Sequence, residues 1–212
     1  MNRCDKGAIA RLALPLAVAF VLWGIMFGLR WGNFWLLMSI SAGALALWAA
    51  VWDRARLSKL LFWRWRWFPT GFALAALLYG VFWLGNWVAG RVFPFAHSQV
   101  TAIYGIKSTT DARLIALALV FLIGPAEEIF WRGFVQKQLE RCWLGRWEAV
   151  VVGALIYAAV HVWSGNMMLV GAALTAGLFW GSVLAATENL WSGILSHVLW
   201  DVAVFLLWPI GG

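Results

Sequence analysis

The run Leu122-Ile-Gly-Pro-Ala-Glu-Glu-Ile-Phe-Trp-Arg132 decides how this chain folds, because it places two adjacent carboxylates, Glu127 and Glu128, inside an apolar segment. A charged side chain at the centre of a lipid bilayer costs at least ~2.5 kcal/mol, and such residues almost always face the interior of a helix bundle and mark a functional site. The run therefore predicts a membrane-spanning helix whose carboxylates point toward other helices.

The composition of the whole chain agrees with this prediction. Hydrophobic residues make up 64% of the 212 residues, charged residues only 12%, and the mean hydropathy is +0.82. This leaves too little polar surface to cover a water-soluble globule. The apolar runs are long and show no strand-like alternation, so we expect an all-α fold, a polytopic transmembrane helix bundle rather than a barrel.

The apolar runs predict about seven or eight spans, at roughly 20 residues per span. We place seven of them at residues 9–29, 33–52, 68–90, 113–135, 148–163, 167–187 and 190–208. We divide the chain into N-terminal transmembrane helices with an interfacial loop, residues 1–112, and a C-terminal core, residues 113–205. The loop, residues 91–112, is the longest connection, and we expect it to lie on the membrane surface.

Basic residues are unevenly distributed over the connections between the spans. With seven spans, one side of the membrane receives 12 Lys and Arg residues and the other receives 4. Positive residues favour the cytoplasmic side, so we expect the N-terminus in the cytoplasm. This bias and attraction to anionic lipid account for the net charge of +7, so we assign no nucleic-acid partner.

The fourth span predicts a specific arrangement of its charged residues. Glu128 and Arg132 are four residues apart, share a helix face and are expected to form a buried ion pair. Glu127 lies about 100° around the helix and is the freer carboxylate. Pro125 removes the backbone hydrogen bond to the carbonyl of Phe121 and is expected to kink the helix beside the two glutamates.

Two later spans each contain a histidine. His161 follows Tyr157 by one helical turn, and His197 precedes Asp201 by one turn, so that each pair shares a face. At about 1.5 Å per residue, Glu127, His161 and His197 lie roughly 15, 20 and 12 Å from the cytoplasmic ends of their helices. These depths allow Glu127, His161, His197 and Asp201 to meet in one layer as a hydrolytic or metal site.

In order along the chain, these motifs resemble the glutamic-type intramembrane proteases related to the type II CAAX prenyl endopeptidase, also called the CPBP or Abi family. The matching elements are Glu-Glu-x-x-x-Arg at Glu127, Glu128 and Arg132, aromatic-x-x-x-His at Tyr157 and His161, and His-x-x-x-Asn/Asp at His197 and Asp201. The resemblance covers about residues 113–205. It implies a membrane-embedded endopeptidase in which Glu127, helped by His161, activates water. It also implies that Glu128 and Arg132 hold the site in shape while His197 and Asp201 stabilise the oxyanion.

Two positions depart from the family pattern. Tyr157 stands where the family usually has Phe, and Asp201 stands where Asn is frequent. An ionised carboxylate cannot donate a hydrogen bond to an oxyanion, so Asp201 must be protonated, orient His197 or bind a metal. Glu127, His161, His197 and Asp201 would suit zinc or another divalent metal as ligands. We favour catalysis without a metal and assign no cofactor as required.

The expected partners are the lipid bilayer and a membrane-anchored or lipidated protein substrate. The family's best-known target is a prenylated C-terminal tail. The compact chain also resembles prokaryotic members that process C-terminal sorting anchors or serve in bacteriocin immunity, so we expect a multi-pass protein of a prokaryotic cytoplasmic membrane. The alternatives are a non-enzymatic transporter or scaffold that binds protons or a cation, and a purely structural network of Glu127, Glu128 and Arg132.

Overall fold

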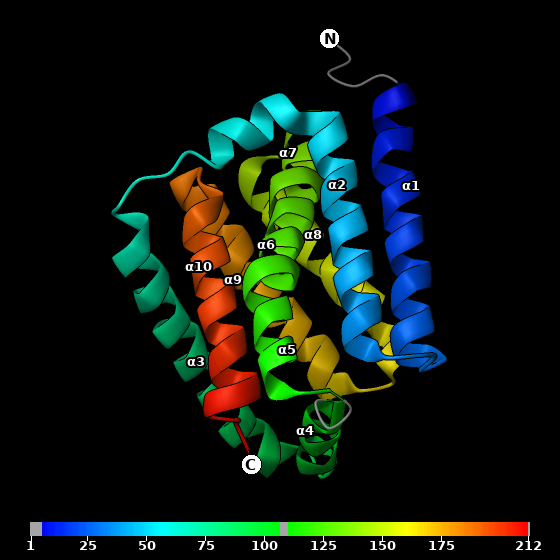
Figure 1. Cartoon of the computed structure of the whole chain (residues 1–212), viewed down its shortest axis with the longest axis vertical. Helices are drawn as coiled ribbons and strands as arrows, with labels where there is room; N and C mark the ends of the chain where they lie inside the picture. Colours follow the sequence, from blue (N-terminus) through cyan, green and yellow to red (C-terminus); the bar gives the residue numbers. More distant parts are fainter. Residues whose placement is uncertain (1–5, 107–109, 212) are drawn as a thin grey trace.

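The fold was obtained as a computed structural model, which describes residues 6–106 and 110–211. Every regular element in these two ranges is a helix (Figure 1). The elements in chain order are α1 (Lys6–Trp23), η1 (Gly24–Gly28), α2 (Phe34–Leu60), α3 (Trp67–Val92), α4 (Ala96–Gly105), α5 (Ala112–Ala118), η3 (Leu119–Ile123), α6 (Gly124–Glu127), η4 (Glu128–Gln136), α7 (Lys137–Cys142), α8 (Arg146–Val160), η5 (His161–Ser164), α9 (Met167–Thr187), α10 (Leu190–Val202) and η6 (Ala203–Leu207). The prediction of an all-α bundle is confirmed.

Seven helical stretches within the described residues are long and apolar enough to cross a membrane, and the protein is an integral, multi-pass membrane protein. They are Gly7–Gly28, Phe34–Leu60, Trp67–Val92, Ala112–Cys142, Arg146–Ser164, Met167–Thr187 and Leu190–Leu207. Each predicted span corresponds to one of these stretches, although the predicted ends at residues 29, 33 and 208 fall one residue outside them. The division at residue 112 into two domains stays a prediction.

The second stretch is longer than predicted because α2 continues beyond its apolar part. At Asp53 the backbone leaves helical geometry, with φ −136° and ψ 30°, and the chain then bends across the end of the bundle (Figure 1). The turns after the bend contain Arg54, Arg56 and Lys59, so the helix changes direction where its sequence becomes basic.

The long connection after the third span contains its own short helix, α4. It lies at the end of the bundle opposite the bend in α2, next to the C-terminus of the chain (Figure 1). Gln99 of α4 ties it to the start of α9, because its carbonyl accepts a hydrogen bond from Asn166 at 2.8 Å and its side-chain oxygen accepts one from the amide of Met168 at 3.0 Å. Whether this connection lies on the membrane surface stays a prediction.

The fourth span departs from regular α-helix around Pro125. π-helical turns precede it at Leu119–Ile123 and follow it at Glu128–Gln136. Such wide turns inside helices are frequent at functional sites. Proline has no backbone N–H to donate, and the π-helical turns on either side of it accommodate the missing hydrogen bond. They also set the direction in which the side chains of Glu127 and Glu128 project from the helix.

The C-terminal helices pack closely. A Cβ atom added to Gly177 of α9 would lie 2.9 Å from the Cα of Ala154 in α8, so the two backbones touch at a position that only glycine allows. At the end of the bundle near the bend in α2, Lys137 pairs with Glu140 and Glu188, both at 2.8 Å. Since Lys137 lies near the end of the fourth span and Glu188 precedes α10, the Lys137–Glu188 pair links the helices that carry the glutamate motif and the second histidine.

Candidate active site

The ion pair predicted within the fourth span is present. Arg132 Nη1 lies 3.4 Å from Glu128 Oε1, and both side chains are almost fully buried. The guanidinium also donates to the carbonyl of Ala176 at 3.3 Å and lies over the rings of Tyr157 and Trp180, at 4.6 and 5.3 Å from their centroids. A delocalised, planar cation suits such a site, because it can stack on aromatic faces and bridge two acceptors at once.

Glu127 points away from this ion pair, as its position on the helix predicted. Its Oε2 accepts a hydrogen bond from the Tyr157 hydroxyl at 3.3 Å and lies 3.6 Å from His197 Nε2. Its Oε1 is buried and has no hydrogen-bond partner. The hydroxyl that distinguishes Tyr157 from the more usual Phe therefore contacts Glu127 directly.

His197 of α10 is surrounded by three carboxylates. Nδ1 lies 3.0 Å from Glu128 Oε1, whereas Nε2 lies 3.6 Å from Glu127 and 3.5 Å from Asp201 Oδ2. The ring can donate from Nδ1 to Glu128 and share a proton at Nε2 with Glu127 or Asp201. His197 is thus the side chain that joins the two glutamates to Asp201.

His161 lies one step further from Glu127. Its ring packs edge-on against Tyr157 at 4.9 Å, and Tyr157 in turn bonds to Glu127. Nδ1 lies 2.8 Å from the carbonyl of Tyr157, and Nε2 lies 3.3 Å from Trp23 Nε1, the indole nitrogen. Because a carbonyl only accepts and an indole N–H only donates, His161 carries its proton on Nδ1 and accepts at Nε2.

Two tryptophans that sequence reasoning did not single out complete the site. Trp23, fully buried in α1, holds His161. Trp180 of α9 stacks on His197, with ring centroids 3.7 Å apart and an angle of 20° between the planes. The sequence has 18 tryptophans and none stands in a recognisable motif, so composition could not show which two reach the site.

Gly193 lies where α10 faces Glu128. A Cβ atom at this position would be 2.9 Å from Glu128 Oε2, closer than a nonbonded contact allows. We expect Gly193→Ala to displace this carboxylate from His197 and lower the rate of substrate cleavage about 10²-fold, because small errors in positioning are costly in catalysis. Gly153→Ala is the matched control, since its Cβ would meet Gln136 at an ordinary 3.7 Å. Equal rates for the two variants would show that the approach of Gly193 to Glu128 has no catalytic importance.

Trp23 can be tested by removing only its N–H. We expect Trp23→Phe to lower kcat about 10-fold with little change in KM, because the His161 ring loses the donor that fixes its orientation while Trp23 does not line the substrate cavity described below. The control is Trp67→Phe, which changes a buried tryptophan whose indole nitrogen has no hydrogen-bond partner. An unchanged kcat in Trp23→Phe would argue against a positioning role.

The four side chains named as metal ligands do not converge on one point. Within residues 6–106 and 110–211, no group of three or more His, Cys, Asp or Glu side chains is arranged to hold a metal ion. Glu127 and Asp201 both face Nε2 of His197, but both ring nitrogens of His161 already have protein partners. For His161 to become a ligand, its hydrogen bond to either Trp23 or the carbonyl of Tyr157 would have to break.

A cavity of about 620 Å³ reaches the candidate catalytic residues. Glu127, Tyr157, His161, His197 and Asp201 form part of its wall, and most of the remaining wall is aliphatic or aromatic. Glu128 and Arg132 do not line it. The structure thus separates residues that a substrate can touch from residues that hold them in place.

Comparison with protein families agrees with this site. Residues 109–203 match the family described as type II CAAX prenyl endopeptidase Rce1-like, and this range contains both glutamates, both site histidines and Asp201. Neither the curated proteins nor the solved structures contain a match to the chain. With these motifs, in this order, on helices that bring them together, residues 109–203 are similar to the Rce1-like family of type II CAAX prenyl endopeptidases.

Proposed function

We propose that this protein is an intramembrane endopeptidase that hydrolyses a peptide bond of a membrane-anchored protein, with Glu127 as the general base. The observation that carries the proposal is the buried, unpartnered Oε1 of Glu127 at the wall of the cavity. A buried polar atom normally has a partner, and one without a partner needs an explanation. An acceptor for the proton of the attacking water supplies that explanation.

The reaction uses the surrounding side chains as follows. Glu127 takes a proton from water, whose oxygen bonds to the carbonyl carbon of the scissile peptide. The resulting oxyanion accepts a hydrogen bond from His197 Nε2, which already faces Glu127 and Asp201. When the C–N bond breaks, the proton held by Glu127 passes to the leaving amine. Asp201 orients His197. His161 is held in place by Trp23 and the carbonyl of Tyr157, and it helps Glu127 to activate the water.

Two residues, Arg132 and Glu128, act without touching substrate, and a third, Trp180, supports His197 from within the cavity wall. Arg132 neutralises Glu128, Glu128 holds Nδ1 of His197, and Trp180 covers one face of the imidazole. The ion pair and the hydrogen bond are stronger in this buried, apolar environment than they would be in water. The proposed substrates are a prenylated C-terminal tail or a C-terminal sorting anchor. We place the protein in a prokaryotic cytoplasmic membrane.

The test is a map of protein termini in the membrane fraction of host cells that carry either the wild-type protein or Glu127→Gln. We expect one set of termini next to membrane anchors to disappear in the variant while uncleaved precursors accumulate. Unchanged termini, with the variant present at normal level, would contradict proteolysis and favour the transport or scaffold alternative.

Chelation distinguishes the metal-dependent form of the mechanism. If Glu127, His161, His197 and Asp201 bound zinc, incubation with a chelator would abolish cleavage and added zinc would restore it. In the mechanism proposed here, the purified protein keeps its activity after chelation.

A further inference from the structure

The cavity lies in one half of the molecule only. Its wall is formed by η1, by the ends of α3, α8 and α10 that point toward α4, by the beginnings of α2 and α9, and by η3 and α6 of the fourth span. Among the lining residues are Phe95, Val100 and Tyr104 of the α4 segment and Met167 at the start of α9, with Met167 63% exposed. The cavity therefore extends to the end of the bundle where α4 lies (Figure 1).

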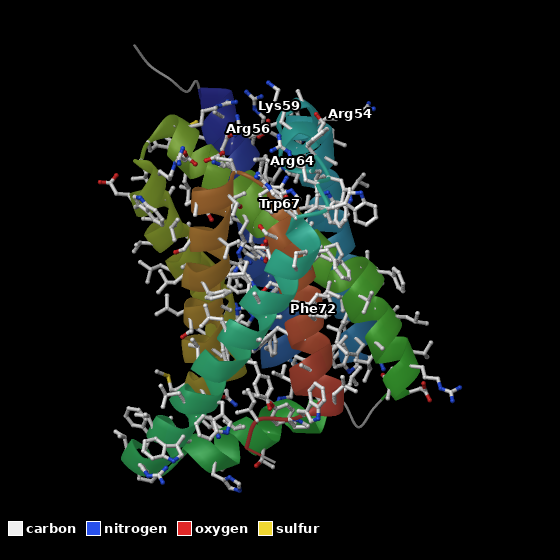
Figure 2. The ribbon with its side chains drawn as sticks, turned by 90° about the vertical axis from the view of Figure 1, so that its left-hand side faces the viewer. Arg54, Arg56, Lys59, Arg64, Trp67 and Phe72 are labelled. Atoms are coloured by element: carbon white, nitrogen blue, oxygen red, sulfur yellow. The ribbon has the colours of Figure 1, made fainter. Side chains whose placement is uncertain are left out.

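The basic residues gather at the opposite end. Figure 2 shows Arg54, Arg56, Lys59 and Arg64 together at the end of the molecule where the bend in α2 lies, far from α4. Lys137, Arg141 and Arg146 flank the α7–α8 turn at this same end. Since positive residues favour the cytoplasmic side, this distribution predicts that the end of the cavity near α4 faces the non-cytoplasmic side of the membrane.

The wall chemistry limits what the cavity can hold. None of the described residues that line it is Lys or Arg, and its charged side chains are the carboxylates Glu127 and Asp201. A free C-terminal carboxylate bound here would find no Lys or Arg to pair with, and the one imidazole that donates into the cavity, His197, is already flanked by Glu127 and Asp201. The added carboxylate would therefore face two like charges, which is unfavourable where water is scarce. The large apolar area of the wall suits uncharged, hydrophobic side chains.

We infer that the cavity receives an internal, uncharged apolar segment of a membrane-anchored protein, presented from the non-cytoplasmic side, and that the chain continues beyond the cleaved bond rather than ending in the cavity. This inference rests on the proposed peptidase activity. It adds the side of entry and the chemical class of the substrate. A short prenylated tail presented from the cytoplasm is the occupant that it excludes.

Glycines in the wall allow the cavity to be filled without touching the catalytic residues. Gly85 of α3 lines the cavity, and a Cβ atom there would meet nothing within 4 Å. Gly90, on the same helix but outside the cavity wall, is equally open and gives the matched control. We expect Gly85→Leu to lower cleavage at least 10-fold through a higher KM, and Gly90→Leu to cleave like the wild type. Equal cleavage by both variants would overturn the assignment of this cavity to the substrate.

The side of entry is tested with a membrane-impermeant maleimide on intact spheroplasts, with the unsubstituted protein as background. Trp31, at the α4 end, and Trp65, at the basic end, are 72% and 81% exposed and are replaced by cysteine one at a time. We expect labelling of Trp31→Cys and not of Trp65→Cys. The reverse pattern would place the opening in the cytoplasm and overturn the inference.

The map of termini separates this inference from the activity on which it rests. If Glu127→Gln changes no termini, the peptidase itself is contradicted. If it does, we expect the lost termini on the non-cytoplasmic side, beside an apolar segment with further residues after the cleaved bond. Lost termini a few residues from the end of a cytoplasmic tail would uphold the peptidase and overturn the inference.

Discussion

Glu127→Gln is expected to lower the rate of peptide cleavage by about 10³-fold or more while the protein remains folded, because general-base catalysis contributes on the order of 10²–10⁴-fold and an amide cannot accept the proton of water. The substitution keeps the size of the side chain and leaves an oxygen available to the Tyr157 hydroxyl, which lies 3.3 Å from the carboxylate. The measurement is the single-turnover rate of the purified protein with the substrate that the termini map identifies.

The control for this variant is Glu140→Gln, which changes a carboxylate paired with Lys137 at the basic end of the bundle, away from the cavity. We expect it to cleave at the wild-type rate. A Glu127→Gln variant that retains more than about a tenth of the wild-type rate would remove Glu127 from the role of general base, since even the low end of that range is larger.

Arg132→Met is expected to lower the free energy of unfolding by about 3–5 kcal/mol and to abolish cleavage, because it leaves Glu128 buried without its cation. Glu128 is 1% exposed, and the ion pair with Arg132 at 3.4 Å is its only contact with a permanently charged cation among the described residues. The loss of the stacking contacts with Tyr157 and Trp180 adds to the effect. A denaturant titration of the purified protein in detergent, which follows its unfolding, measures the change in free energy.

Two further variants show whether the cost comes from the unpaired charge. Arg141→Met, on an exposed residue of α7, is expected to change stability by less than about 0.5 kcal/mol. The double variant Arg132→Met with Glu128→Gln should recover part of the loss, since no uncompensated carboxylate remains. If Arg132→Met alone unfolds like the wild type, the ion pair does not stabilise the protein.

The sequence was sufficient for the features that depend on one helix at a time. Long apolar runs gave the seven spans, because a bilayer requires about 20 apolar residues per helix. The four-residue spacing of Glu128 and Arg132 gave their ion pair, and the 100° offset gave Glu127 its different surroundings. The sequence predicted a kink at Pro125 but neither the π-helical turns around it nor the bend at Asp53. These features depend on which hydrogen bonds the backbone groups make in the packed bundle.

Contacts between helices were decided only by the tertiary structure. The three motifs indicated that Glu127, His161, His197 and Asp201 share one layer. They did not indicate that His197 lies between three carboxylates, or that Trp23 donates a hydrogen bond to Nε2 of His161. Such contacts depend on rotations of helices about their own axes, which spacing along one helix does not fix. The end of the bundle that the cavity reaches has the same origin, since its wall combines residues from Phe27 to Ile210. The sequence by itself determined that this protein is a membrane helix bundle with buried carboxylates and histidines, and packing decided which of their atoms meet.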